Sequence, residues 1–182
     1  MKQSAQLLCI NPKCGERLPI ISTQIRCEKC GYLLDVEYKE TPSTKLKEIF
    51  YQRRSRDNIY NESGVWRFRE LLNFAEIETE ELDQCSTFLV SLDGAEGRQS
   101  KPYHMSKVSS FVGINNDSLM LQPEGYNPSG SFKDNGMASA VTHAKMTGAK
   151  KIICASTGNT SASAGMFAAN ENMECDVYIP DG

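Results

Sequence analysis

Two short segments of the chain combine residue types that can carry out chemistry. Residues 127–134 read NPSGSFKD, and residues 155–161 read ASTGNTS. The first segment places Lys133 where a loop is expected to turn into a helix, and a lysine amine forms a Schiff base with an aldehyde cofactor. The second segment opens another helix, whose N–H groups and hydroxyls can bind an anion. Together they predict pyridoxal phosphate at Lys133 and an amino-acid carboxylate at the second turn.

Four cysteines lie in two close pairs, Cys9 with Cys14 and Cys27 with Cys30. A glycine follows the second cysteine of each pair, and glycine lets the backbone curl so that N–H groups face the sulfur. Four thiolates complete the tetrahedral shell of zinc and leave no open catalytic position. The spacing therefore predicts a structural Zn²⁺ site. The alternatives are four incidental thiols, or a ribbon that has lost its metal.

Composition limits the classes of partner. The chain has 182 residues and a net charge of -3, so no basic surplus favours nucleic acid. No apolar run reaches the length that spans a bilayer, and the N-terminus lacks the apolar core of a signal peptide. Seven cysteines, an odd number, favour metal over disulfides. We expect a cytoplasmic protein that acts on a small molecule.

Strand and helix patterns alternate in the second half of the chain, which predicts an α/β fold with a parallel sheet and right-handed crossovers. The expected strands are 119–121, 151–155 and 175–179, and the expected helices are 131–147 and 160–170. Further upstream, residues 33–38 alternate like a strand, and the apolar residues between 65 and 72 are spaced like a short amphipathic helix.

These patterns divide the chain into three parts. Residues 1–38 are the expected zinc ribbon, and residues 39–62 are a linker or an exposed helix, with Arg53, Arg54 and Arg56 on a solvated face. Residues 63–182 form an incomplete α/β domain, because the last strand lies bare at the end of the chain. Such a strand exposes an edge, so we expect a truncated chain that aggregates or forms a homodimer.

Residues 127–136 (NPSGSFKDNG) and 155–163 (ASTGNTSAS) resemble the active-site segments of threonine synthase, a pyridoxal-phosphate enzyme of the second fold type, the tryptophan-synthase-β-like group. Residues 64–68 (GVWRF) are also similar, and the cysteine module resembles the ribbon at the N-terminus of some threonine synthases. The resemblance implies that Lys133 is the Schiff-base lysine and that Asn159 contacts the ring hydroxyl of the cofactor. It also implies that the residues flanking Asn159 hold the substrate carboxylate, namely Ser156, Thr157 and Thr160.

The chain departs from the family pattern in two places. Asn135 stands where the family usually has arginine, and residues 97–104 replace the usual Gly-x-Thr-Pro-Leu segment. Threonine synthases are also roughly twice this long or more. The resemblance therefore places the glycine-rich phosphate loop, and the hydroxyl that faces the pyridine nitrogen, beyond Gly182.

The function implied by the resemblance is that of a carbon-oxygen lyase, which converts O-phospho-L-homoserine and water to L-threonine and phosphate. A sister enzyme of the same fold, threonine dehydratase or cysteate synthase, is one alternative. A non-catalytic zinc-ribbon fragment that acts as a binding module is another. We expect the isolated chain to be inactive. Neither His104 nor His143 is given a catalytic role, and His143 is expected on a helix surface. The remaining cysteines are read as core or surface thiols: Cys85, Cys154 and Cys175.

Overall fold

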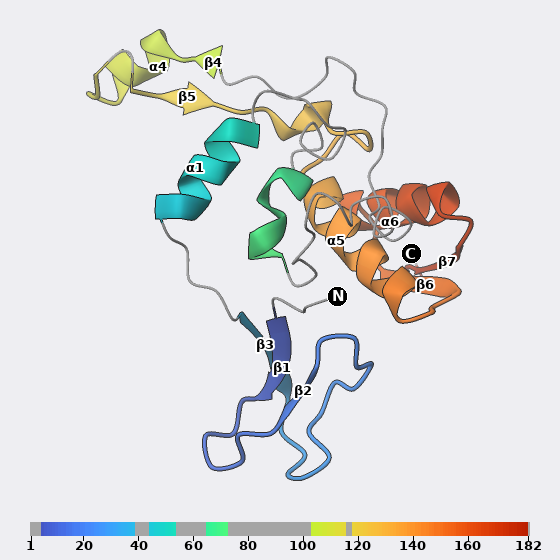
Figure 1. Cartoon of the computed structure of the whole chain (residues 1–182). Coiled ribbons are helices and arrows are strands. Elements are labelled where there is room, and N and C mark those ends of the chain that lie inside the picture. Colours follow the sequence, from blue (N-terminus) through green and yellow to red (C-terminus); the bar gives the residue numbers. More distant parts are fainter. Residues whose placement is uncertain (1–4, 39–43, 54–64, 73–102, 116–117, 182) are drawn as a thin grey trace.

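The computed structural model describes residues 5–38, 44–53, 65–72, 103–115 and 118–181. Its N-terminal part is a small antiparallel sheet, drawn at the bottom of Figure 1. Strand β1 (Ala5–Cys9) lies between β2 (Arg17–Pro19) and β3 (Leu34–Tyr38). The strand expected near residues 33–38 is therefore confirmed. The connections between the strands carry Cys14, Cys27 and Cys30, and Cys9 is the last residue of β1.

The C-terminal part alternates helices and strands. Helix α5 (Lys133–Met146) leads to β6 (Lys151–Ala155), and helix α6 (Asn159–Asn170) leads to β7 (Glu174–Tyr178). Strands β6 and β7 pair in parallel, and α6, the connection between them, packs on both. The expected helices and strands of this part are confirmed, although α5 begins two residues later than the pattern predicts.

Gly148 ends helix α5, as the sequence predicts. Gly148 has a φ of 77°, a left-handed conformation that glycine adopts without strain. Its N–H donates to Lys145 O, and the N–H of Ala149 donates to Ala144 O. These bonds satisfy carbonyls that the helix leaves unpaired, so the chain turns sharply into β6.

One expectation about the sheet is wrong. The strand expected at residues 119–121 forms as β5 (Met120–Leu121), but it does not join the parallel sheet. It pairs antiparallel with β4 (Tyr103–His104), and the short helix α4 (Ser106–Phe111) lies between them in sequence. A two-residue strand carries too little pattern to indicate its partner, and here an antiparallel neighbour, joined to it through α4, takes its hydrogen bonds.

The core of the α/β part forms where α5 and α6 meet the segment η2 (Trp66–Leu71). The buried cluster consists of Trp66, Ala138, Val141 and Phe167. The short helix expected here forms as the 3₁₀ segment η2, and the backbone of Phe68 inside it is non-helical at φ -107° and ψ 26°. This kink separates the short helix into two turns. Trp66 is the one buried apolar residue of this segment, whereas Phe68 and Leu71 are 41% and 39% exposed, so the apolar spacing predicted a short helix but not its buried face.

Helix α1 (Thr44–Gln52) precedes an ion pair that the sequence did not indicate. Both terminal nitrogens of the Arg53 guanidinium bond to the Glu70 carboxylate, and one also donates to the carbonyl of Arg67 at 2.8 Å. The side chain of Arg53 is only 14% exposed, so the expected solvated face is wrong for this arginine. Arg54 and Arg56 lie outside the described residues. The pair links the end of α1 to η2.

Within the described ranges, the structure contains no helix that is both long enough and apolar enough to cross a membrane.

Candidate active site and metal centre

The four paired cysteines converge in space. Their sulfur atoms all lie within 4.8 Å of one another, with Cys9 Sγ 3.4 Å from Cys30 Sγ and Cys14 Sγ 3.7 Å from Cys27 Sγ. Zinc–sulfur bonds of about 2.3 Å in a tetrahedron place the sulfurs about 3.8 Å apart. The cluster is therefore compatible with a zinc site.

The backbone around the cysteines supports the same arrangement. Gly15 and Gly31 have φ values of 64° and 75°, the left-handed conformation that lets the chain turn back on the preceding cysteine. The thiols differ electrostatically. A hydrogen bond from the Tyr32 backbone lowers the pKa of Cys30 to about 7, whereas burial raises the pKa of Cys9 to about 12. The cluster thus holds sulfurs in unlike environments, and a bound cation would favour the thiolate form of each.

Lys133 is the first residue of α5 and is half-buried. Its backbone N–H donates to Ser131 Oγ at 3.3 Å, and its Nζ lies 4.1 Å from the centroid of the exposed Phe132 ring. Among the ion pairs of the described residues, none involves the Lys133 amine. The side-chain amine therefore lies against a ring face rather than against a carboxylate, which leaves it available to a ligand.

Side-chain hydrogen bonds fix the loop that precedes Lys133. Asn127 Nδ2 donates to Ser131 O at 3.0 Å and to Glu124 Oε2 at 2.7 Å, and Gly130 turns the chain with a φ of 81°. The same Glu124 oxygen accepts a bond of 3.0 Å from Asn135 Nδ2. Asn135, the residue that departs from the family pattern, therefore binds the carboxylate that anchors the loop.

The second predicted turn joins β6 to α6. Ser156 and Thr157 lie between the two elements, Asn159 is the exposed first residue of α6, and Thr160 follows it. The N–H of Gly158 donates to Ser156 Oγ at 3.2 Å, which shapes the turn. The first N–H groups of a helix have no partners within the helix, so this turn offers donors and a positive dipole end to an anion.

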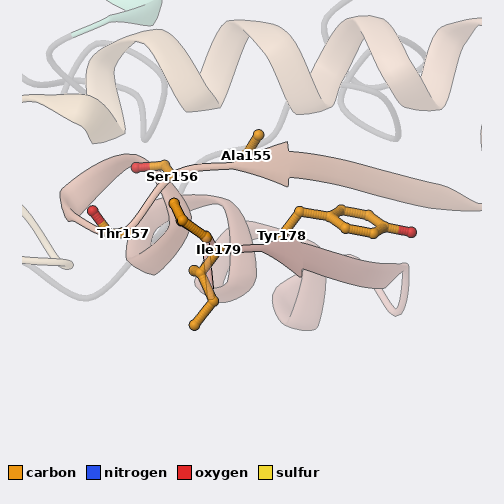
Figure 2. Close-up of a pocket in the computed structure, with 6 residues that line it drawn as sticks. Ala155, Ser156, Thr157, Tyr178 and Ile179 are labelled. Carbon is orange, nitrogen blue, oxygen red and sulfur yellow. The ribbon is translucent and has the colours of Figure 1, made fainter. Parts of the chain in front are cut away.

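An open depression of about 470 Å³ lies at the carboxyl ends of β6 and β7. Figure 2 shows Ser156 and Thr157 on the turn after β6, with Ile179 beside them at the end of β7. Open parallel sheets bind ligands at this edge. The depression is lined by Ala155, Ser156, Thr157, Tyr178, Ile179 and Pro180.

Asp134 connects the two predicted segments. Its carboxylate accepts hydrogen bonds from the N–H and the Oγ of Ser129, at 2.8 and 2.5 Å, and from Ser163 Oγ in α6, at 2.5 Å. The structure thus ties the start of α5, which carries Lys133, to the second turn of α6, which begins at Asn159. Within the described part of the chain, no hydrogen bond joins Lys133 directly to Asn159.

Sequence reasoning missed this role of Asp134 because the residue looked ordinary. An acidic residue in the first turn of a helix is common for electrostatic reasons, so its presence carries no special signal. Its partner Ser163 is 29 residues away, and no local pattern relates the two positions.

His143 does not lie on a free surface as expected. It is half-buried in α5, and its Nε2 lies 3.0 Å from the carbonyl oxygen of Ile20, a buried residue that directly follows β2. This contact joins the cysteine module to the helix that carries Lys133. Cys154 and Cys175 are half-buried, and burial raises the pKa of Cys175, whereas Cys85 lies outside the described residues.

Comparison with known proteins gives independent findings. Residues 98–182 match the family described as "Pyridoxal-phosphate dependent enzyme". Over 171 residues, 93% of this chain, the sequence is 35% identical to the threonine synthase of Methanocaldococcus jannaschii. Shorter stretches are 61% identical over 59 residues to the threonine synthase of Bacillus sp. (strain ULM1) and 55% identical over 64 residues to that of Mycobacterium leprae.

The chain spans only part of these relatives. Its match covers 37% of the length of the M. jannaschii protein, 17% of the Bacillus protein and 18% of the M. leprae protein. The shorter matches cover 32% and 35% of this chain, respectively. The resemblance to threonine synthase that the two motifs indicate is therefore confirmed, and the second half of the chain carries the pattern of the pyridoxal-phosphate dependent enzymes.

Proposed function

We propose that this chain supplies the lysine-bearing part of a threonine synthase, a carbon-oxygen lyase that converts O-phospho-L-homoserine and water to L-threonine and phosphate. One observation carries the proposal: Lys133 and Asn159 begin two helices that the Asp134–Ser163 hydrogen bond holds together. The similarity to threonine synthases supports the same reaction. The partner is an amino-acid substrate of small size.

The residues present fit the reactive end of pyridoxal phosphate. Bound there, the cofactor supplies an electron sink for charge that develops beside the substrate nitrogen. The Lys133 amine would hold the cofactor and, when free of it, could move protons at the substrate carbons. The Asn159 amide would donate to a ring oxygen of the cofactor. The substrate carboxylate binds at the start of α6, to N–H groups and to hydroxyls from Ser156, Thr157 and Thr160.

The fold proposed around this site is part of a parallel-sheet domain of the second pyridoxal-phosphate fold type, over residues 63–182. The parallel pair β6 and β7, with α6 between them in sequence, supports this assignment. Residues 1–38 form the zinc ribbon of the proposal, and residues 39–62 connect it to the domain.

The proposed metal is a structural Zn²⁺ ion bound by Cys9, Cys14, Cys27 and Cys30. Sulfur separations of 3.4 and 3.7 Å support a tetrahedral shell. Four protein ligands leave no position for water or substrate, so the metal has no part in the reaction. Thiolates that stay reduced suit a cytoplasmic location, which we propose for the protein.

Mapping the cofactor attachment tests the proposal at its centre. The purified chain is incubated with pyridoxal phosphate, reduced with borohydride and digested, and the pyridoxyl group is located by mass spectrometry. Label concentrated on Lys133 is the expected result, and Lys133→Ala should remove it. The exposed Lys107 and Lys150 serve as internal controls for non-specific reaction. A label spread evenly over the lysines contradicts the assignment.

Amino-acid titrations separate the alternatives. The absorbance of the bound cofactor should change with O-phosphohomoserine at lower concentration than with threonine, whereas a dehydratase would show the reverse. A protein that acts only as a zinc-ribbon binding module would respond to neither. Asn159→Ala should shift the absorbance of the bound cofactor, because the ring oxygen loses a hydrogen bond worth about 0.5–1.5 kcal/mol if uncharged.

A further inference from the structure

Asp134 is a buried carboxylate next to the lysine of the proposed site. It is the second residue of α5 and only 5% exposed. A buried carboxylate is costly unless donors satisfy its oxygens. Here the donors are one backbone N–H and two serine hydroxyls, and within the described residues no lysine or arginine pairs with it. Such short, directional bonds fix positions more than they neutralise charge.

The three bonds reach in two directions. Ser129 lies in the loop before Lys133, and both its N–H and its hydroxyl donate to Asp134. Ser163 lies in α6 and is fully buried, and its hydroxyl donates to the same carboxylate oxygen, Oδ1, as the Ser129 hydroxyl. One carboxylate therefore joins the loop, the first turn of α5 and the second turn of α6.

We infer that Asp134 is a positioning residue, which holds the Lys133 amine in a fixed place relative to the anion-binding start of α6. The inference rests on the proposed function of Lys133 and goes beyond it by assigning the residues that orient this lysine. Reaction at a bound aldehyde needs an amine held close to its attack geometry, and a displacement of about 1 Å can cost about a hundredfold in rate. We call the bonds of Asp134 to Ser129 and to Ser163 its two arms. Weakening either arm should therefore slow the reaction of Lys133 with the aldehyde, although the lysine itself is still present.

Two variants remove one arm each. Ser163→Ala deletes the bond to α6, and Ser129→Ala deletes the hydroxyl bond to the loop while its N–H bond remains. Ser129→Thr keeps the hydroxyl and serves as the conservative variant, since Ser129 is half-buried. Ser139→Ala, on α5, is the matched control, because Ser139 takes part in none of these bonds. Asp134→Asn weakens both arms together.

The first measurement is the rate at which borohydride-trapped pyridoxyl accumulates on Lys133, with circular dichroism as a check on helix content. Ser163→Ala and Asp134→Asn should each lower this rate about tenfold, Ser129→Ala should lower it less, and the Ser129→Thr and Ser139→Ala proteins should match the parent. Equal rates on Lys133 in the parent, Ser163→Ala and Asp134→Asn proteins, all with unchanged helix content, would overturn the inference.

The second measurement is independent of the cofactor. Hydrogen exchange of the amides in residues 127–133 reports how firmly the loop is held, and the Ser129 N–H donates directly to Asp134. Exchange there should rise about tenfold in Asp134→Asn and stay unchanged in Ser139→Ala. If the parent shows no preference for Lys133, the proposed function fails. Exchange then decides the inference alone, and unchanged exchange in Asp134→Asn overturns it.

Discussion

The cysteine module and the α/β region are ordered by different forces. In residues 5–38 the buried apolar positions are few, and two of them are the cysteines Cys9 and Cys27, while Ile25 is 76% exposed. The α/β region instead buries Trp66, Val141 and Phe167 in one cluster. A module with so little apolar burial would depend on the proposed metal for its stability, whereas the α/β region depends on packing. The two should therefore respond to different perturbations.

The largest expected effect follows from removing two ligands. Cys27→Ser with Cys30→Ser should abolish zinc binding and free the amides of β1 and β3 to exchange, because metal binding supplies about 10–16 kcal/mol in small zinc modules. Helices α5 and α6 should keep their protection. Elemental analysis and hydrogen exchange measure both. Cys154→Ser is the control, because this thiol lies outside the cluster. Equal loss of protection in both regions would mean that they unfold as one unit.

A core truncation should do the opposite. Phe167→Ala should cost the α/β region about 3–5 kcal/mol, because it leaves a cavity beside the other cluster residues. The zinc content should not change. Denaturant unfolding measured by circular dichroism gives the free energy. Phe111→Ala is the matched control, since that ring is 91% exposed and should change stability little. A loss of zinc in the Phe167 variant would contradict the expectation that the two regions are stabilised independently.

The pair between Arg53 and Glu70 is expected to contribute less. Burial is the largest single influence and raises the pKa of Glu70, but the Arg53 hydrogen bond, a backbone hydrogen bond and the charges of Arg53 and Arg69 together lower the pKa overall. A lowered pKa gives stability that is present above the unfolded-state pKa of about 4.3 and is lost as pH falls through the folded-state value.

Glu70→Gln should therefore cost about 1–3 kcal/mol at neutral pH and flatten the loss of stability in acid. Denaturant midpoints between pH 3 and 7 provide the measurement. Glu174→Gln should change stability by about 0.5 kcal/mol or less, since that carboxylate is 74% exposed. If the Glu70 variant loses as much stability in acid as the parent, other carboxylates are responsible for that loss.

The smallest effect is expected where the regions meet. His143→Ala removes the contact with Ile20 O and should cost about 0.5–1.5 kcal/mol, shared between both sides of the junction. Exchange near Ile20 and in α5 should rise together. His104→Ala, which changes an exposed histidine, is the control. A rise confined to one side would show that the modules are coupled by other contacts.

Sequence patterns predicted elements formed by neighbouring residues and missed contacts between residues far apart in the chain. Strand β6 and helix α6 follow from apolar runs between glycine-marked turns, and the cysteine cluster follows from spacing. The pairing of β5 was wrong because two residues carry no periodicity. The Arg53–Glu70 and Asp134–Ser163 contacts join residues 17 and 29 positions apart, and only the folded chain brings them together.

The position of Trp66 has a practical consequence. It is the single tryptophan of the chain and is completely buried between η2 and the helices α5 and α6. Indole fluorescence shifts when the ring meets water, and the cysteine module contains no indole. An optical unfolding curve recorded at tryptophan wavelengths therefore follows the region that bears Lys133. Melting of the metal-bound module would leave that emission unchanged, so it needs a separate probe such as the zinc released to a chromogenic chelator.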